Sequence, residues 1–251
     1  MAGSSRSRNT TKSRRIDAFD LASGRVLAGK YRVENLLGSG WEGEVYRVTE
    51  LRTDVPRAAK LFFPHRNVRD RAIRFYAQKL DKLRDCSIVI QYHHLEPLRF
   101  RGENVTCLIS DLVEGRLLER FVQEQPGRRL QPFEALHLLY DIVVGLEAIH
   151  QRREYHGDLH GRNVLVQRRG IGFDVKVLDF FHWGRADRSK IQEDVIQIVH
   201  VLYETVGGRR HYAKQPDEIK KICCGLRRDL ISRKFPTAGH LRTHLESFSW
   251  D

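Results

Sequence analysis

The stretch HGDLHGRNVLV, residues 156–166, followed by VKVLDFF, residues 175–181, is the most informative part of the sequence. Asn163 lies five positions after Asp158, and Asp179 lies 21 positions after Asp158. The apolar segments between Asn163 and Asp179 predict a β-hairpin. One carboxylate can orient a hydroxyl nucleophile and accept its proton, while amide and carboxylate oxygens suit Mg²⁺ beside phosphates. The pattern therefore predicts a phosphoryl-transfer site.

A second motif, GSGWEGEV at residues 38–45, lies between strand-like segments at 31–37 and 45–48. Its glycines allow the backbone to approach phosphates closely. Lys60 follows Val45 by fifteen residues, within RAAKLFF. Taken singly, a strand lysine is usually solvated, and Asp and Asn commonly cap turns. The order of all these motifs favours the functional interpretation.

Together these motifs resemble the protein-kinase superfamily over roughly residues 26–249. The resemblance implies an α+β, bilobal protein kinase-like fold. A small antiparallel β-sheet lobe would carry one helix, and a larger lobe would be mainly helical. We expect a basic, disordered tail at residues 1–25, the N-lobe at 26–110 and the C-lobe at 111–251.

The resemblance also implies roles for individual residues. Asp158 would orient the nucleophile, Lys60 would contact the α- and β-phosphates, and His160 would approach the γ-phosphate in place of the family's lysine. Asn163 and Asp179 would bind Mg²⁺. The expected ATP contacts are Gly38, Gly40, Gly43, Val45, Ala58, Lys60, Ser110, Asp111, Val113 and Leu165.

Apolar periodicity predicts the remaining scaffold. Helices are expected at 70–83, 133–150 and 194–206, and strands at 88–92 and 105–111. Gly207 and Gly208 would end the last of these helices. Asp194 resembles the family's buried helix-start aspartate, which accepts hydrogen bonds from the catalytic-loop backbone. An ordinary partner of the helix dipole is the alternative.

One departure from the family concerns the partner of Lys60. The helix at 70–83 lacks the glutamate that pairs with the lysine in the family, and Tyr76 stands at its position. Between Leu61 and Leu95, the acidic residues are Asp70, Asp81 and Asp85. Tyr76, Glu42 and Glu44 are the candidates for orienting Lys60.

Other departures concern regulation. The catalytic loop contains H-G-D in place of H-R-D, which removes the arginine that reads a phosphate on the activation segment. Phe181 replaces the glycine after Asp179 and Phe180, and 15 positions separate Asp179 from Asp194. The A-P-E motif is absent, and Phe235 stands where its arginine partner is expected. These changes predict a short activation segment with one dominant conformation.

Composition narrows the class of protein. The net charge is +12, of which residues 1–15 contribute +5 through arginine and lysine. The remaining charge is dispersed and no nucleic-acid-binding motif accompanies it, so we expect an acidic partner for the tail and no dedicated nucleic-acid role. The four cysteines lack C-x-x-C spacing, which favours free thiols. With no apolar run long enough to cross a membrane, we expect no membrane insertion and a cytoplasmic location.

We therefore predict an ATP- and Mg²⁺-dependent phosphotransferase, a protein serine/threonine kinase with a minimally regulated activation segment. A pseudokinase that binds nucleotide or a partner without catalysis is one alternative. The H-G-D-L-H sequence is also similar to that of aminoglycoside and other small-molecule kinases, so a small hydroxyl compound is an alternative substrate.

Overall fold

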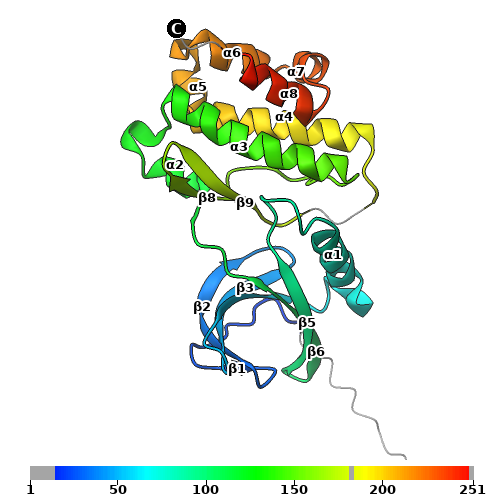
Figure 1. The fold of residues 1–251 in the computed structure, drawn as a ribbon. Coiled ribbons are helices and arrows are strands. Elements are labelled where there is room, and N and C mark those ends of the chain that lie inside the picture. Colours follow the sequence, from blue (N-terminus) through cyan, green and yellow to red (C-terminus); the bar gives the residue numbers. More distant parts are fainter. Residues whose placement is uncertain (1–14, 181–183, 249–251) are drawn as a thin grey trace, which may run out of the picture. The chain divides into compact units, whose positions relative to one another are not determined.

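In the computed structural model, the described residues are 15–180 and 184–248, and the chain divides into two compact units (Figure 1). The first unit comprises residues 1–73 and 94–109, and the second comprises 74–93 and 110–251. Residues 74–93, expected in the N-lobe, group with the second unit. Most of the basic tail, residues 1–14, and Phe181 lie outside the described residues.

A six-stranded sheet forms the first unit, and its last two strands extend into the second unit. Its strand order is β1-β2-β3-β4-β6-β5, with antiparallel pairing from β1 through β4. Alternate residues such as Val33, Tyr46 and Val48 point into a buried core, as expected for a sheet with one covered face. The strands are β1 (Val26–Leu27), β2 (Tyr31–Ser39), β3 (Gly43–Glu50), β4 (Pro56–Phe62), β5 (Tyr92–Phe100) and β6 (Glu103–Asp111).

The segment before β1 belongs to this core, which corrects the expected tail boundary at residue 25. Ile16, Phe19 and Leu21 are buried among the residues of the sheet. The Phe19 ring contacts the Phe63 and Phe100 rings at centroid distances of 5.4 and 5.2 Å. Charged and polar residues surround these three in the sequence, so the short apolar pattern was not recognised as part of the core.

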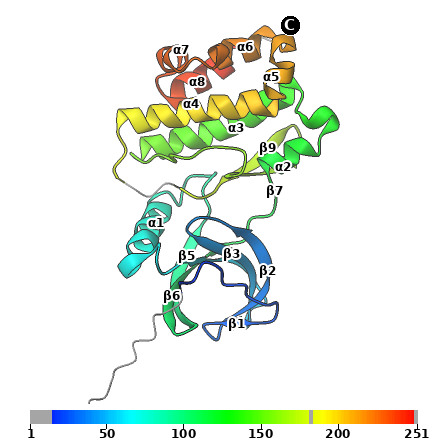
Figure 2. The ribbon, with the colours of Figure 1, turned by 180° about the vertical axis from the view of Figure 1, so that it is seen from behind.

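The second unit is mainly helical. Its helices are α1 (Arg71–Lys82, whose first turn lies in the first unit), α2 (Leu118–Gln123), α3 (Pro132–Gln151), α4 (Arg188–Thr205), α5 (Gly208–His211), α6 (Asp217–Cys223), α7 (Arg228–Lys234) and α8 (Ala238–Glu246). A three-stranded sheet has the order β7 (Arg116–Leu117), β8 (Val164–Arg169), β9 (Gly172–Val177). Helices α3 and α4 lie side by side in both views of the ribbon (Figures 1 and 2).

Two predicted elements differ from the structure. The strand expected at 88–92 begins at Tyr92, and Val89 forms an isolated bridge with Val177. The helix expected at 194–206 begins six residues earlier, at Arg188, because the Asp187 side chain caps it by accepting from Lys190 N at 3.0 Å. This helix ends as predicted, with Gly207 in the left-handed region at φ 98°.

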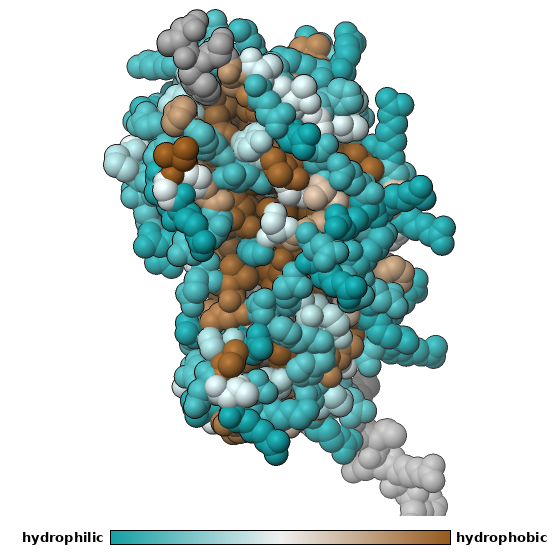
Figure 3. Space-filling view, in the orientation of Figure 1, coloured by the Kyte–Doolittle hydropathy of each residue, from teal (hydrophilic) through white to brown (hydrophobic). Residues whose placement is uncertain are grey.

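The four cysteines, Cys86, Cys107, Cys223 and Cys224, are free thiols, as their spacing predicted, and the first three are buried. Hydrophilic residues cover most of the face shown in Figure 3. Among the described residues, no helix has both the length and the apolar composition needed to cross a membrane.

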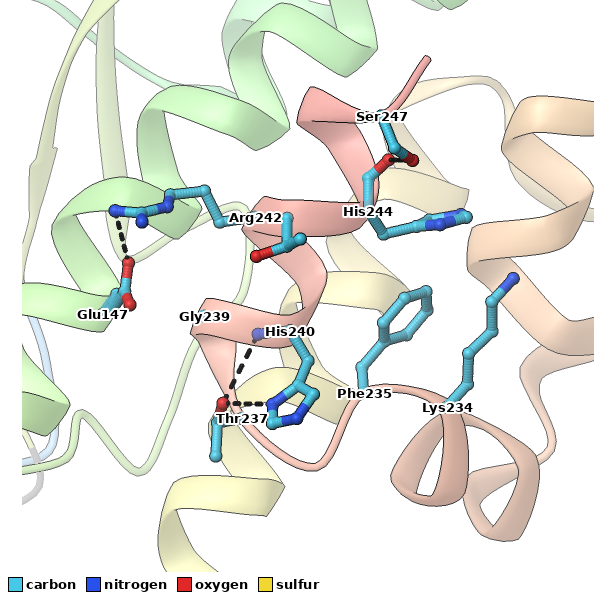
Figure 4. A pocket seen from close by; sticks show the side chains of 10 residues that line it. Glu147, Lys234, Phe235, Thr237, Gly239, His240, Arg242, His244 and Ser247 are labelled. Carbon is cyan, nitrogen blue, oxygen red and sulfur yellow. Dashed lines mark hydrogen bonds and ion pairs between the residues drawn. The ribbon is translucent and has the colours of Figure 1, made fainter.

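A depression of about 650 Å³ lies in the second unit between α3 and the α7–α8 corner (Figure 4). Phe235, which stands where the family's arginine is expected, lines it and is buried at 1% exposure. The basic groups around it have partners: Arg242 pairs with Glu147 at 2.8 Å, and Lys234 Nζ donates to Lys221 O at 2.9 Å. The depression contains none of the sequence motifs.

Candidate active site

The loop that carries Asp158 connects α3 to β8 in the second unit, and α4 holds its backbone. The Asp194 carboxylate, fully buried, accepts from His156 N and Gly157 N, each at 2.7 Å. Gln197, three residues further along α4, accepts from Leu159 N at 2.7 Å. Asp194 thus anchors the loop backbone, as its resemblance implied, although it lies inside the helix and not at its start.

His156 supports the same loop from within the core. Its Nε2 lies 2.8 Å from Leu178 O and its Nδ1 accepts from Asp158 N at 3.3 Å. A neutral ring protonated on Nε2 satisfies both contacts. Burial lowers the pKa of His156, which favours this neutral form, and the ring also packs against Phe180 at a centroid distance of 4.7 Å. His156 therefore links the loop to the segment that precedes and includes Phe180.

Asp158 presents a carboxylate to solvent beside two neighbours that the sequence predicted. The side chain of Asp158 is 58% exposed. Asn163 Nδ2 donates to Asp158 O at 3.0 Å and to Asp158 Oδ2 at 3.2 Å. His160 Nε2 lies 3.5 Å from Asp158 Oδ2 and 3.2 Å from Asn163 Nδ2. The structure thus brings together Asp158, His160 and Asn163.

Asp179 follows β9 at the end of the predicted hairpin. The hairpin forms as expected, with β8 and β9 antiparallel from Val164↔Val177 to Arg169↔Gly172. Leu178 N donates to Asn163 O at 2.8 Å, which ties the end of β9 to the start of β8. Asp179 adopts a left-handed backbone, with φ 54°, and its side chain is exposed whereas Phe180 is buried. This sharp turn of the chain places adjacent side chains in opposite environments.

The residues present suit a magnesium ion. The Asn163 amide nitrogen is committed to Asp158, which leaves the amide oxygen as the group of this side chain that can face a cation. With the Asp179 carboxylate it supplies hard oxygen ligands, the type that Mg²⁺ selects while retaining several waters. The donor set therefore fits the metal that the sequence implies.

In the first unit, the glycine-rich loop joins β2 to β3. A side chain on Gly43 would meet Leu61 O at 1.9 Å, so close packing against β4 requires glycine there. At Gly38 and Gly40 a Cβ would meet nothing within 4 Å. Packing thus explains Gly43, whereas Gly38 and Gly40 leave an open backbone surface of the kind that phosphates approach.

Lys60 lies on β4 opposite Val45 on β3, and it has a carboxylate partner. Lys60 Nζ donates to Glu42 Oε2 at 2.9 Å, and the two side chains are 11% and 18% exposed. Of the candidates named from the sequence, Glu42 makes the contact that the structure shows. The amino-acid pattern allowed three candidates because a loop acid has no fixed direction until the loop is folded.

Glu44 has a different task. It is 4% exposed and accepts from Tyr46 Oη and from Phe19 N. Tyr46 Oη in turn lies 3.1 Å from Leu21 N, and burial, with the hydrogen bond to Glu44, raises the pKa of Tyr46 to about 12. Glu44 therefore fastens the segment before β1 to the sheet.

The remaining expected nucleotide contacts are distributed over both units. Val45 lies on β3 and Ala58 on β4, in the first unit, and each is partly exposed. In the second unit, Ser110 is buried, Asp111 N donates to Gln91 O at 3.0 Å, and Asp111 O accepts from Ser110 Oγ at 3.3 Å. Leu165 on β8 is partly exposed, as is Val113.

Sequence reasoning missed Gln197 and Lys79. Lys79 on α1 is 6% exposed, donates to Tyr155 O at 3.1 Å and lies 3.6 Å from Glu154 Oε2. Burial lowers the pKa of Lys79, while Glu154 opposes that shift. A lysine on the apolar face of a predicted helix was the signal that could have identified this contact.

Comparisons with known proteins agree with these motifs. The protein kinase domain model matches residues 31–218. Serine/threonine-protein kinase PrkC of Bacillus subtilis is 27% identical over 160 residues, which cover 62% of this chain and 23% of PrkC. Serine/threonine-protein kinase PkaA of Streptomyces coelicolor is 30% identical over 201 residues, which cover 74% of this chain and 36% of PkaA.

The fold has solved counterparts. The kinase domain of Mycobacterium tuberculosis PknI matches with a TM-score of 0.62 and 19% identity, covering 90% of this chain and 98% of that chain. The matches to PrkC and PkaA span 36% or less of those relatives' own length. The matched domain, the motif order and the fold agree, and the chain belongs to the protein kinase domain family.

Proposed function

We propose that this chain is an ATP- and Mg²⁺-dependent phosphotransferase that acts on serine or threonine hydroxyl groups of proteins. The observation that carries the proposal is the exposed Asp158 carboxylate on a loop whose backbone a buried Asp194 holds. A carboxylate on a fixed loop can meet a hydroxyl in a constant geometry, which lowers the entropic cost of reaction. The relatives named above as serine/threonine-protein kinases support the substrate class.

The proposed reaction follows from these groups. The hydroxyl oxygen bonds to the γ-phosphorus, the bond from the γ-phosphorus to the β–γ bridging oxygen breaks, and ADP leaves with that electron pair. Asp158 orients the hydroxyl and accepts its proton. Lys60 contributes positive charge to the α- and β-phosphates, and His160 can donate to the γ-phosphate. Magnesium held by Asn163 and Asp179 would neutralise charge on the phosphate oxygens.

We propose that the activation segment works without an activating phosphate. Residues 180–187 alone separate Asp179 from α4, and between Phe180 and Glu193 the one hydroxyl side chain is Ser189. The H-G-D sequence also lacks the arginine that would read such a phosphate. This short segment favours a second candidate function, transfer to a small hydroxyl compound, because it offers a peptide little surface to lie against.

Two further proposals concern the cellular compartment of the chain and a binding partner. The free, mostly buried cysteines suit a reducing compartment and support a cytoplasmic location. The basic residues 1–15 support binding to an acidic partner.

Nucleotide binding tests the proposed metal site. ATP should raise the midpoint of thermal unfolding, and Mg²⁺ should raise it further, because a ligand that binds only the folded chain stabilises it by about 2.7 kcal/mol at 100 times its Kd. Asp179→Ala should abolish the increment due to Mg²⁺. Asp174→Ala is the matched control, since this carboxylate on β9 pairs with Arg169 at 2.6 Å and should leave the increment intact. No thermal shift at millimolar ATP would contradict the proposal.

An acceptor panel then distinguishes the two candidate substrates. A generic basic protein and a set of small hydroxyl compounds receive labelled phosphate from Mg²⁺-ATP. Label on protein serine or threonine supports the proposed class, whereas label on a small compound alone supports the second candidate. ATP binding without transfer to any acceptor would identify a pseudokinase.

A further inference from the structure

Helix α1 offers no glutamate at the position from which the family supplies a carboxylate to the lysine, because Tyr76 stands there. The acids on or beside this helix have other contacts. Asp70 accepts from Thr106 Oγ1 at 2.6 Å and from Asn67 Nδ2 at 2.9 Å. Asp81 and Asp85 lie 3.3 Å from Arg84 and 3.6 Å from Arg152 respectively.

Helix α1 carries a buried base, Lys79, three residues after Tyr76. Lys79 donates to Tyr155 O, and Glu154 lies within ion-pair distance of both Lys79 and Lys82, at 3.6 and 2.7 Å. These contacts are all within the second unit. Helix α1 is therefore fastened to the segment that precedes the catalytic loop, and its two lysines serve that attachment.

The glycine-rich loop supplies a carboxylate to Lys60 within the first unit. The Lys60–Glu42 distance of 2.9 Å is that of a charge-assisted hydrogen bond, and both side chains are largely withdrawn from water. A partly buried pair of this kind resists screening better than an exposed one. The pair is thus able to fix the direction of the Lys60 side chain.

The backbone around Glu42 is itself held in place. Phe63 N donates to Glu42 O at 2.9 Å, and Gly40 N donates to Gly43 O at 2.9 Å. Gly43 packs directly on Leu61 O, which admits no side chain. Next to Glu42, the Trp41 ring stacks with the Arg66 guanidinium, 4.1 Å from its centroid. These contacts hold the backbone at Glu42 on both sides of that residue.

We propose that Glu42 is the positioning residue of Lys60, so that a carboxylate of the glycine-rich loop sets the lysine that contacts ATP. This inference rests on the proposed function, because it assigns a role within the same ATP site. It joins two tasks in one loop: the backbone that approaches the phosphates also carries the carboxylate that directs the lysine. Any event that displaces the loop then displaces Lys60 as well.

Steady-state kinetics test the positioning role. Glu42→Gln keeps the size and hydrogen-bonding capacity of the side chain but removes its charge. We expect kcat to fall by roughly 10- to 100-fold, with a KM for ATP that changes by less than about threefold, because the interaction orients phosphates in the transition state. Asp81→Asn on α1 is the matched control and should leave both constants unchanged.

A second readout needs no catalysis. A neighbouring carboxylate favours the protonated amine, and acetic anhydride reacts with the neutral amine, so Glu42→Gln should speed acetylation of Lys60. Mass spectrometry of the Lys60 peptide measures this rate, with Lys30, in the turn between β1 and β2, as an internal reference. Asp81→Asn should leave the Lys60 rate unchanged.

The outcomes separate the inference from the proposed function. If the native chain transfers phosphate but Glu42→Gln matches it in kcat and in Lys60 acetylation, the inference is overturned while the proposed function stands. A Glu42→Gln variant that binds ATP more tightly and turns over no more slowly would show that Glu42 competes with phosphate, which also overturns the inference. If the native chain neither binds ATP nor transfers phosphate, the proposed function fails and the inference falls with it.

Discussion

Burial changes the ionisation of two residues in the second unit, His156 and Lys79. Both are titratable side chains inside the second unit, and burial lowers the pKa of each. His156 is stable as a neutral ring because its two nitrogens each have a suitable partner. Lys79 has a backbone carbonyl and Glu154 nearby, which offset part of the cost of burying an amine. The loop that carries Asp158 therefore rests on groups whose protonation is linked to folding.

The pH dependence of stability should report His156. Its folded pKa lies below the value of 6.5 for an unperturbed histidine, so the unfolded chain binds more protons as the pH falls below 6.5. The contribution of His156 to stability is thus complete above pH 6.5 and is lost as the pH falls toward the folded pKa. Urea unfolding at about pH 7.5 and about pH 5 measures the loss.

A variant isolates this contribution from those of other histidines. His156→Gln removes the titration, so its free energy of unfolding should fall less between the two pH values than that of the native chain. His240→Gln, at an exposed position, should retain the native pH dependence. An identical slope for all three proteins would contradict the assignment of a buried neutral His156.

Helix α4 is the element that determines the shape of the catalytic loop. Its buried Asp194 and its Gln197 accept from three backbone N–H groups of that loop. Asp187, at its exposed start, caps the helix by accepting from Lys190 N. The same helix therefore has two carboxylates whose removal should have different costs.

Alanine substitutions should separate the two roles on α4. Asp187→Ala should cost about 1 kcal/mol of stability, the usual cost of losing an N-cap. Asp194→Ala should cost about 3–5 kcal/mol, because it leaves buried donors without an acceptor. Urea unfolding measures both values, and Asp194→Ala should also reduce phosphate transfer. Equal and small losses for the two variants would contradict the anchoring role of Asp194.

Elements with strong apolar periodicity could be predicted from the sequence. Features that depend on long-range contacts could not. The α3 helix and the β8–β9 hairpin follow the predicted residues because apolar spacing and turn chemistry are local signals. The start of α4 was missed because Arg188 to Glu193 contains one apolar residue, Ile191, and the cap at Asp187 was overlooked. The role of Glu42 needed the folded glycine-rich loop, since neighbouring Glu44 has the same chemistry but faces the core.

Across the whole molecule, the described chain forms two units with different internal supports. The first is a sheet whose core includes the segment before β1, and the second is a set of helices around a short hairpin. Glu44 and Tyr46 bind the backbone of Phe19 and Leu21, so the N-terminal segment contributes to folding of the sheet. The domain boundary therefore lies before residue 16, and a chain trimmed at residue 25 would lack part of its core.

The N-terminal segment can be tested by a single substitution. Phe19→Ala should destabilise the first unit by about 3–5 kcal/mol, because it leaves a cavity between Phe63 and Phe100. Asp17→Ala is the matched control; this residue is 64% exposed and pairs with Arg15, so its loss should cost less than about 0.5 kcal/mol. Circular dichroism during urea unfolding distinguishes these values. A stability loss for Phe19→Ala as small as that of the control would exclude the segment from the core.

Phosphate transfer by the intact chain and by Asp158→Ala is the measurement that examines the proposed activity as a whole. Labelled γ-phosphate from Mg²⁺-ATP is offered to the acceptor panel, with Asp174→Ala as a carboxylate control on the neighbouring hairpin. The native chain and Asp174→Ala should label an acceptor at similar rates, and Asp158→Ala should lose roughly 100-fold or more of that rate. Transfer by Asp158→Ala at the native rate, or no transfer by the native chain, would contradict the assignment of Asp158 as the catalytic carboxylate.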